Sequence, residues 1–234
     1  MATPLASSSP EAQPAGASPV ILVTFALRAE SGPFRRLVGA GTDLAIIETG
    51  IGQGRTRAVL EKALTMLRPR WVITSGYAGA LNPKLAAGTI VFDADEGWPL
   101  TSRLRASGAL AARFHCAERI AVTASEKKNL WDATGADAIE MESQAIRGLC
   151  RERGIPGATV RVISDAAGED LPLDFNQLLT PELALSYGKL VRALARSPGK
   201  IVDLVRFQRR VQAAARKLGQ TLATLIADRS VWPR

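Results

Sequence analysis

The stretch WVITSGYAGAL, residues 71–81, runs from β-branched and apolar residues into a loop with two glycines. Such a run is typical of a strand that is buried on both faces of a parallel sheet. Four more apolar runs of this kind lie along the chain, at residues 20–27, 44–50, 88–95 and 157–164. Helical periodicity occurs between them, over residues 53–69 and 142–156. This alternation predicts an α/β fold around a parallel or mixed sheet.

The composition is that of a globular protein. The chain has 234 residues, enough for one large domain with a substantial core, and 47% of them are hydrophobic while 22% are charged. No apolar run approaches the roughly 20 residues that span a bilayer. Residues 1–19 are rich in Ala, Ser and Pro and lack the basic and apolar regions of a signal peptide, which predicts a disordered leader. We therefore expect a cytoplasmic protein.

Histidine and cysteine are too scarce for two common kinds of chemistry. His115 is the single histidine, and Cys116 and Cys150 form no CxxC motif. A zinc site needs more ligands at close spacing, and no nucleophile motif lies near His115. We predict two buried or half-buried thiols, no metal, no organic cofactor, and chemistry that depends on carboxylates.

The net charge of +8 is concentrated towards the C-terminal end, where residues 186–234 contain eleven Lys or Arg and two Asp. Apolar residues recur there at helical spacing and predict an amphipathic helix with a basic face: Ile201, Leu204, Val205, Val211, Leu218, Leu222 and Leu225. The helix either packs on the domain, which is the interpretation we prefer, or makes peripheral contact with an anionic membrane surface. Few aromatic residues and no recognition motif argue against nucleic-acid binding.

Glycine loops follow two of the predicted strands. TGIGQG, residues 49–54, and SGYAGALNP, residues 75–83, both come directly after an apolar run. Gly lets the backbone turn sharply and approach a ligand, and open α/β sheets bind ligands beyond the carboxyl ends of their strands. The spacing matches neither a dinucleotide motif nor a Walker loop. Each loop alone is compatible with a tight turn, but the two together indicate a shared pocket.

Three acidic residues also lie at strand ends. Glu140 and Glu142 belong to DAIEMES, residues 137–143, and Asp165 follows VRVIS. Each has a purely structural interpretation, because Glu stabilises the first turn of a helix and Asp caps turns. Beside glycine loops, the three acids also fit a site that binds sugar hydroxyls and donates a proton. The residues alone leave both interpretations open.

The motifs AIEMES and VRVISDAA resemble the purine nucleosidase and nucleoside phosphorylase superfamily, above all its 5′-methylthioadenosine/S-adenosylhomocysteine nucleosidases. SGYAGALNPKLAAGTIV and TGIGQGR are similar to two glycine loops of this family, and FALRAE to its N-terminal segment. The resemblance implies a nucleoside phosphorylase-like three-layer fold around a central mixed sheet. Residues 20–170 would form the catalytic domain, and residues 171–234 a basic helical C-terminal extension packed on it.

The resemblance also implies roles for the matching residues. Met141 and Glu142 would hold the ribose, with the Glu142 carboxylate accepting from its 2′- and 3′-hydroxyls. Asp165 would be the general acid at N7 of the leaving purine, oriented by Ser164, and Glu30 would activate water. This is consistent with the chemistry, because N-glycosidic cleavage passes through a cation-like sugar and needs a protonated base, negative charge and a placed nucleophile.

Two parts of the sequence depart from the family pattern. Tyr77 replaces a small serine beside the ribose, in the loop that also supplies Gly79, and the other glycine loop supplies Gly52; we expect all three to contact substrate. SEK, residues 125–127, occupies the place where apolar residues clamp the base. Thr74 and Tyr77 replace the Arg and Ser with which phosphorolytic members hold phosphate, so we expect hydrolysis rather than phosphorolysis.

We therefore expect an N-ribosyl hydrolase that acts as a homodimer and releases adenine from a small-molecule substrate, a 5′-substituted adenosine. Two alternatives stay open. SEKKNLWDATGADAIEMES and the basic C-terminal segment also resemble hopanoid-associated phosphorylases, which implies removal of adenine from adenosylhopane. Tyr77 and the missing apolar clamp are also compatible with a nucleoside-binding protein that has lost its activity.

Overall fold

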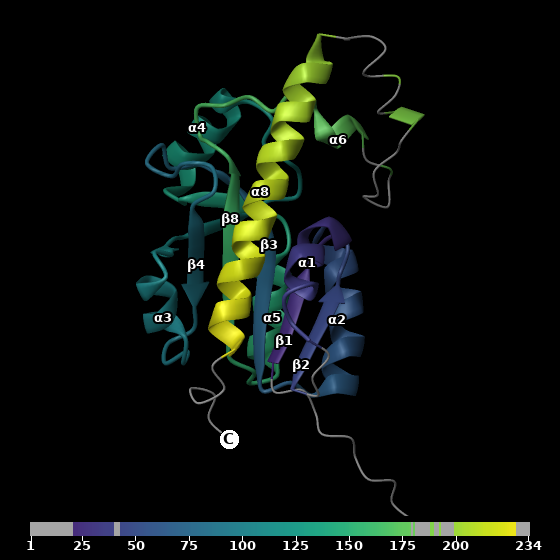
Figure 1. Ribbon diagram of the computed structural model, residues 1–234, viewed down its shortest axis with the longest axis vertical. Helices are drawn as coiled ribbons and strands as arrows, with labels where there is room; N and C mark the ends of the chain where they lie inside the picture. The colour runs from purple at the N-terminus through teal and green to yellow at the C-terminus, as the bar shows by residue number, and fades with distance from the viewer. Residues whose placement is uncertain are drawn as a thin grey trace, which may run out of the picture.

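The computed structural model describes residues 21–39, 43–178, 180, 188, 189, 192 and 199–227. Eight strands in this part of the chain form one mixed sheet (Figure 1). They are β1 (Ile21–Phe25), β2 (Leu44–Glu48), β3 (Trp71–Ala80), β4 (Ile90–Ala94), β5 (Leu110–Ala111), β6 (Phe114–Cys116), β7 (Ala138–Glu140) and β8 (Gly157–Asp165). The five apolar runs correspond to β1, β2, β3, β4 and β8. The predicted leader, residues 1–19, lies outside the described residues.

Strand β3 lies near the centre of the sheet and links its two parts. The strand order is β2-β1-β3-β8-β4-β5, with β2, β1, β3 and β8 parallel and β4 antiparallel to β8. The C-terminal end of β3 also pairs with β7, which is antiparallel to β3 and parallel to β6. The prediction of a mixed sheet is therefore confirmed, and the carboxyl ends of β1, β3 and β8 meet at one edge.

Helices cover both faces of the sheet (Figure 1). They are α1 (Arg28–Arg35), α2 (Gln53–Leu67), α3 (Thr101–Ala106), α4 (Ala124–Thr134), α5 (Ser143–Glu152), α6 (Phe175–Leu178) and α8 (Lys200–Ala227). Helices α1 and α8 pack on one face, where Phe34 and Leu218 join the cluster that contains Val23 of β1. On the other face, Leu60 of α2 and Ile146 of α5 share a cluster with Leu22. Neighbouring residues of a strand point to opposite faces, so the sheet has a core on each side and the fold has three layers.

The predicted amphipathic helix is α8, and its two halves differ. The C-terminal half buries Leu218 and Leu222 in the core shared with α1. Gly219 makes this packing close, because a Cβ atom at that position would lie 2.9 Å from the backbone nitrogen of Phe34. The N-terminal half exposes Ile201, Val202 and Val205. The division of the chain at residue 170 stays a prediction. Among the described residues, no helix is both long and apolar enough to cross a membrane.

Candidate active site

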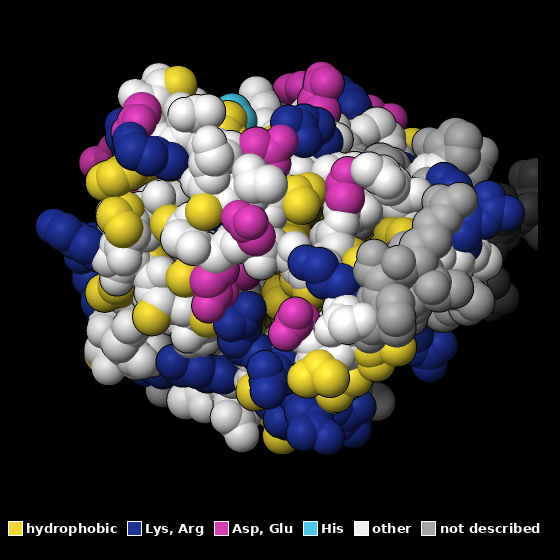
Figure 2. All heavy atoms as spheres, turned by 90° about the horizontal axis from the view of Figure 1, so that it is seen from above, with side chains coloured by type: hydrophobic (Ala, Val, Ile, Leu, Met, Phe, Trp, Pro, Cys, Tyr) yellow, Lys and Arg dark blue, Asp and Glu magenta, His cyan; other side chains and the backbone are white. Residues whose placement is uncertain are grey.

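A cavity of about 370 Å³ lies at the carboxyl ends of β1, β3 and β8. This is the edge at which open α/β sheets bind ligands. Carboxylates from α1, β7 and β8 form part of its wall, and apolar side chains from α6 and α8 form another part. Figure 2 looks onto the molecule from this end, where acidic side chains lie among apolar ones. The cavity therefore combines charge with an apolar surface.

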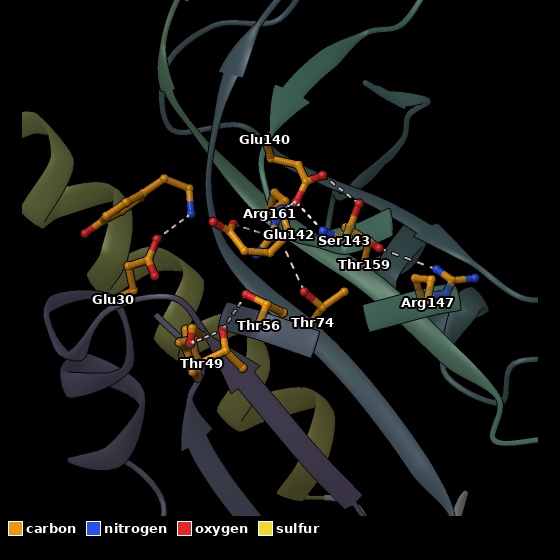
Figure 3. A network of polar contacts seen from close by, with 12 residues as sticks. Glu30, Thr49, Thr56, Thr74, Glu140, Glu142, Ser143, Arg147, Thr159 and Arg161 are labelled. Carbon is orange, nitrogen blue, oxygen red and sulfur yellow. Dashed lines mark hydrogen bonds and ion pairs between the residues drawn. The ribbon is translucent and has the colours of Figure 1, made fainter. Parts of the chain in front are cut away.

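A buried arginine organises the acidic side of the cavity. Arg161 lies in the middle of β8 with 1% of its surface exposed. Its Nη2 donates to Glu140 Oε2 at 2.5 Å and to Thr74 Oγ1 at 3.2 Å, and it lies 3.9 Å from Glu142 Oε2 (Figure 3). An unpaired guanidinium would be very unfavourable inside a sheet, so these partners are what allow an arginine there.

Glu140 pairs with Arg161 and holds the start of α5. Its Oε2 also accepts from the backbone N–H groups of Glu142 at 3.1 Å and Ser143 at 2.8 Å, and its Oε1 accepts from the Ser143 hydroxyl at 2.6 Å. Burial acts to raise the pKa of Glu140, but Arg161 and the Ser143 hydroxyl outweigh it and hold the pKa below its usual value. Glu140 is therefore an ionised anchor, with its oxygens already occupied by protein donors.

Glu142 lies only two residues further on, at the N-cap of α5, in a different electrostatic environment. Its Oε1 accepts from the backbone N–H of Gly52 at 3.0 Å. Burial raises the pKa of Glu142 to about 7, because Glu140 and Glu30 add repulsion and the opposing effects of Arg161 and Gly52 are smaller. The φ angle of Gly52 is +87°, which favours glycine at the position that supplies this donor.

Glu30 enters the site from the first turn of α1. Its Oε2 accepts from the backbone N–H of Leu27 at 2.9 Å, and its Oε1 from that of Tyr77 at 3.1 Å. Burial raises the pKa of Glu30, and these donors and Arg161 offset the effect only in part. A carboxylate with a raised pKa is suited to accept a proton near neutral pH.

Gly76 allows Glu30 and Arg161 to approach β3. Its φ angle is +144°, and a Cβ atom there would lie 2.8 Å from Glu30 Oε1 and 3.0 Å from Arg161 Nη1. No side chain fits between these groups without displacing one of them. The glycine in the SGYAG motif is therefore explained by a close approach of charged side chains, in addition to its backbone conformation.

Asp165 ends β8 with 4% of its surface exposed and is held at both carboxylate oxygens. The Ser164 hydroxyl donates to Oδ1 at 2.5 Å, and the Lys127 ammonium lies 2.5 Å from Oδ2. Gly79 leaves room for the carboxylate, since a Cβ atom at that position would lie 3.2 Å from Oδ2. Asp165 thus has a fixed orientation at the wall of the cavity.

The structure brings most of the predicted site residues together. Those that line the cavity are Glu30, Tyr77, Gly79, Met141, Glu142, Ser164 and Asp165. Gly52 is not among the lining residues, although its neighbour Ile51 is. The backbone N–H of Gly52 instead donates a hydrogen bond to the cavity residue Glu142. The catalytic and binding roles given to these residues stay predictions.

The sequence interpretation missed the two buried cations that pair with carboxylates of the cavity, Arg161 and Lys127. Arg161 could have been found, because an arginine inside a run predicted to be a buried strand requires carboxylate partners. Lys127 gave no such signal, since it belongs to the pair Lys127-Lys128 in a polar segment. That segment is helix α4, where the charges have distinct functions: Glu126 forms a capping box with Thr123, and Lys127 pairs with Asp165.

The apolar wall of the cavity also was not predicted. It comes mainly from residues far along the chain, namely Ile120, Leu171, Phe175, Phe207 and Val211. The rings of Phe175 and Phe207 pack with their centroids 5.7 Å apart. Part of the predicted C-terminal extension therefore belongs to the cavity itself.

The cysteines and the possible metal ligands were the remaining groups of interest. Cys150 is buried and Cys116 half-buried, both as free thiols, which agrees with the prediction. Across the part of the chain that the structure describes, no three His, Cys, Asp or Glu side chains are grouped so as to hold a metal ion.

Comparison with known proteins shows which proteins the chain resembles. Residues 111–196 match the model of the phosphorylase superfamily. The 5′-methylthioadenosine/S-adenosylhomocysteine nucleosidase of Geobacillus thermodenitrificans is 27% identical over 197 residues, which are 67% of this chain and 83% of the relative. The enzyme of the same name from Glaesserella parasuis is 26% identical over 186 residues, 65% of this chain and 80% of the relative.

Solved structures agree in fold. The futalosine hydrolase of Helicobacter pylori superposes with a TM-score of 0.65 at 14% identity, covering 90% of this chain and 98% of its own. The 5′-methylthioadenosine/S-adenosylhomocysteine nucleosidase of Helicobacter pylori, with butyl-thio-DADMe-Immucillin-A, also gives a TM-score of 0.65 at 14% identity, covering 89% and 97%. The chain therefore has the fold of these structures, and its sequence resembles the phosphorylase superfamily over residues 111–196. Within it, the chain resembles the 5′-methylthioadenosine/S-adenosylhomocysteine nucleosidases.

Proposed function

We propose that the protein is an N-ribosyl hydrolase that releases adenine from a 5′-substituted adenosine. The observation that carries this proposal is the convergence of Glu30, Glu142 and Asp165 on one cavity, in a chain that resembles adenine-releasing nucleosidases. The relatives described above do not favour either alternative, cleavage of adenosylhopane or an inactive binding protein.

The carboxylates supply the three requirements of N-glycosidic cleavage. A proton that Asp165 has taken up from solvent passes to N7 of the purine while the electron pair of the glycosidic bond moves to the base. Glu142 accepts from the ribose hydroxyls, and its charge, with that of Glu140, stabilises the cation-like sugar. Water attacks C1′ and gives a proton to Glu30, whose raised pKa suits that task. Met141 packs against the sugar.

Two features support hydrolysis over phosphorolysis. Thr74 is buried, and its hydroxyl already accepts from Arg161. Glu30 lies at the backbone N–H of Tyr77, within the loop where phosphorolytic members hold phosphate. A buried carboxylate at that place repels a phosphate anion.

The apolar wall suits an uncharged 5′-substituent. Phe175 and Phe207 present aromatic surface to the cavity, and Val211 extends it along α8. An alkylthio group would bury its apolar surface there, which is favourable by about 25 cal/mol per Å². Methylthioadenosine is therefore the substrate we expect to be cleaved fastest.

Release of the free base from methylthioadenosine, S-adenosylhomocysteine, adenosine and inosine, with and without phosphate, tests the function. We expect adenine from methylthioadenosine without phosphate and a loss of about 10²-fold or more in Asp165→Asn, the scale of general acid catalysis. Asp132→Asn is the matched control, because Asp132 is exposed on α4. Full activity in Asp165→Asn, or release only with phosphate, would contradict the proposal.

The proposal also covers the oligomeric state of the protein and its cellular compartment. We propose a cytoplasmic homodimer, and the exposed Ile201, Val202 and Val205 of α8 provide an apolar surface for association. Light scattering after size exclusion tests the dimer, and cell fractionation tests the location. Peripheral membrane contact through the basic face of α8 is the competing use of this helix. Flotation with vesicles containing anionic lipid, but not with neutral vesicles, would support it.

A further inference from the structure

A fully buried lysine lies behind the proposed acid. Lys127 is in the first turn of α4 and has no exposed surface. Its Nζ lies 2.5 Å from Asp165 Oδ2 and donates to the backbone carbonyls of Ala166 at 3.0 Å and Glu169 at 2.7 Å. An ammonium has three donors, and here all three have acceptors.

Lys127 is the one buried side chain within α4, at a place where an apolar residue would be the usual choice. The next residue, Lys128, extends from the same helix with 69% of its side chain exposed and pairs with Asp132. Removing a lysine from water costs several kcal/mol before pairing, and an apolar side chain of similar volume often packs as well or better. The burial of Lys127 is therefore explained by its contacts with Asp165 and with the backbone carbonyls of the turn that follows Asp165.

The contacts of Lys127 connect three elements around the cavity. The turn 166–169 is closed by the backbone N–H of Ala166, which donates to Glu169 Oε2 at 3.2 Å. Glu169 also pairs with Arg210 of α8 at 3.0 Å. Lys127 itself does not line the cavity, so it acts on a substrate only through Asp165.

We propose that Lys127 is a positioning residue for general acid catalysis, which rests on the proposed function. Ser164 fixes Oδ1 of Asp165 and Lys127 fixes Oδ2, so the carboxyl group has one orientation towards the purine. As the proton moves from Asp165 to N7, negative charge develops on the carboxylate, and the ammonium at 2.5 Å stabilises it. Lys127 itself takes no part in the proton transfer.

A comparison of two leaving groups tests this role in Lys127→Met. One substrate is methylthioadenosine, whose base must be protonated as it leaves. The other is a 4-nitrophenyl β-riboside with the same 5′-group, whose leaving anion needs no acid. We expect kcat for methylthioadenosine to fall about 10- to 100-fold, with KM nearly unchanged, because a misplaced catalytic group has an effect of this size. The rate for the nitrophenyl riboside stays close to that of the wild type. Each variant is measured at its own optimal pH.

The ratio of the two rates is independent of how much of a preparation is folded, so partial unfolding does not obscure the result. Lys127→Gln, which keeps two donors for the backbone carbonyls, is the second variant, and we expect the same change in the ratio. Lys128→Met is the control and leaves both rates unchanged. Equal losses on both substrates would assign Lys127 a purely structural role, and no loss on either would also overturn the proposal.

The outcome also separates this inference from the proposed function. If Asp165→Asn shows the leaving-group effect and Lys127→Met does not, only the inference fails. If Asp165→Asn shows no such effect, the assignment of Asp165 as the acid fails, and the proposed mechanism fails with it.

Discussion

Single residues of the site differ in charge state because of their immediate partners. Glu140 and Glu142 are two positions apart, yet the pKa of Glu140 lies below its usual value and the pKa of Glu142 is raised to about 7. Arg161 lies 2.5 Å from the first and 3.9 Å from the second. Arg161 thus forms a close ion pair with Glu140 only, and the carboxylate of Glu142 can still accept hydrogen bonds from a ligand.

This difference predicts a specific dependence of stability on pH. The folded-state pKa of Glu142, about 7, lies above its usual 4.5, so the folded protein binds the proton more tightly than the unfolded chain. The contribution is fully present below about pH 4.5 and is lost as the pH rises through about 7. Relative to Glu142→Gln, the wild type should lose up to about 3 kcal/mol of unfolding free energy across this range. Urea unfolding at several pH values measures it, and parallel curves for the two proteins would contradict the prediction.

Gly76 provides a second prediction at this scale. In Gly76→Ala, the new Cβ atom meets Glu30 and Arg161 within about 3.0 Å at a φ of +144°. We expect a loss of roughly 1–3 kcal/mol of stability, from strain and displaced charges, together with a large loss of turnover. Gly54→Ala is the control, since nothing lies within 4 Å of its Cβ position. Thermal unfolding and adenine release measure the two effects, and a variant as active as Gly54→Ala would refute the explanation.

The elements show what could be predicted from the sequence and what could not. The five longer strands are nearly continuous apolar runs, and the helices α2, α5 and α8 have clear hydrophobic periodicity, so the sequence predicts each of them close to its observed bounds. Helix α1 was missed because it contains Gly32 and Pro33, and β7 because it has only three residues. Helix α4 was missed because its buried side chain is a lysine, so the helix has no regular pattern of apolar residues on its buried face.

The site likewise has residues that could be predicted from the sequence and residues that could not. Their positions at strand ends indicated that Glu142 and Asp165 share a pocket, and the family resemblance added Glu30; all three line the cavity. Arg161 and Lys127 act through pairs made across the fold, at sequence distances that a local pattern does not record.

The contact between α8 and α1 gives a prediction at the scale of elements. A Cβ atom at Gly219 would lie 2.9 Å from Phe34 N and 3.1 Å from Pro33 C, both of them backbone atoms that cannot rotate away. Gly219→Ala should therefore destabilise the protein by roughly 1–3 kcal/mol, the usual effect of overpacking. Gly148→Ala, in an open position of α5, should instead stabilise it by roughly 0.5–1 kcal/mol. Denaturant unfolding distinguishes them, and equal changes would show that α8 does not pack closely on α1.

At the scale of the whole molecule, α8 connects the core to the cavity. Its C-terminal half fills the core with Leu218 and Leu222, while Phe207 and Val211 line the cavity. One continuous helix therefore fixes both the packing of the sheet and the position of the apolar wall (Figure 1).

This connection predicts an effect on specificity. Phe207→Ala should raise KM for methylthioadenosine about 10-fold, which corresponds to about 1.4 kcal/mol of lost apolar contact. The KM for adenosine, which lacks the apolar 5′-group, should change much less. Met66→Ala, at an exposed position of α2, is the control. Steady-state kinetics with both substrates decide the question, and equal changes in the two KM values would place the 5′-group elsewhere.

The position of α8 also affects how the protein matures during synthesis. Every strand of the sheet leaves the ribosome before this helix does, so the nascent chain carries an uncovered apolar face beside β1 until the helix is free to dock. The cavity is incomplete for the same period, because Phe207 and Val211 arrive with the helix. Completion of the core and acquisition of activity should therefore coincide, and both should follow the docking of α8.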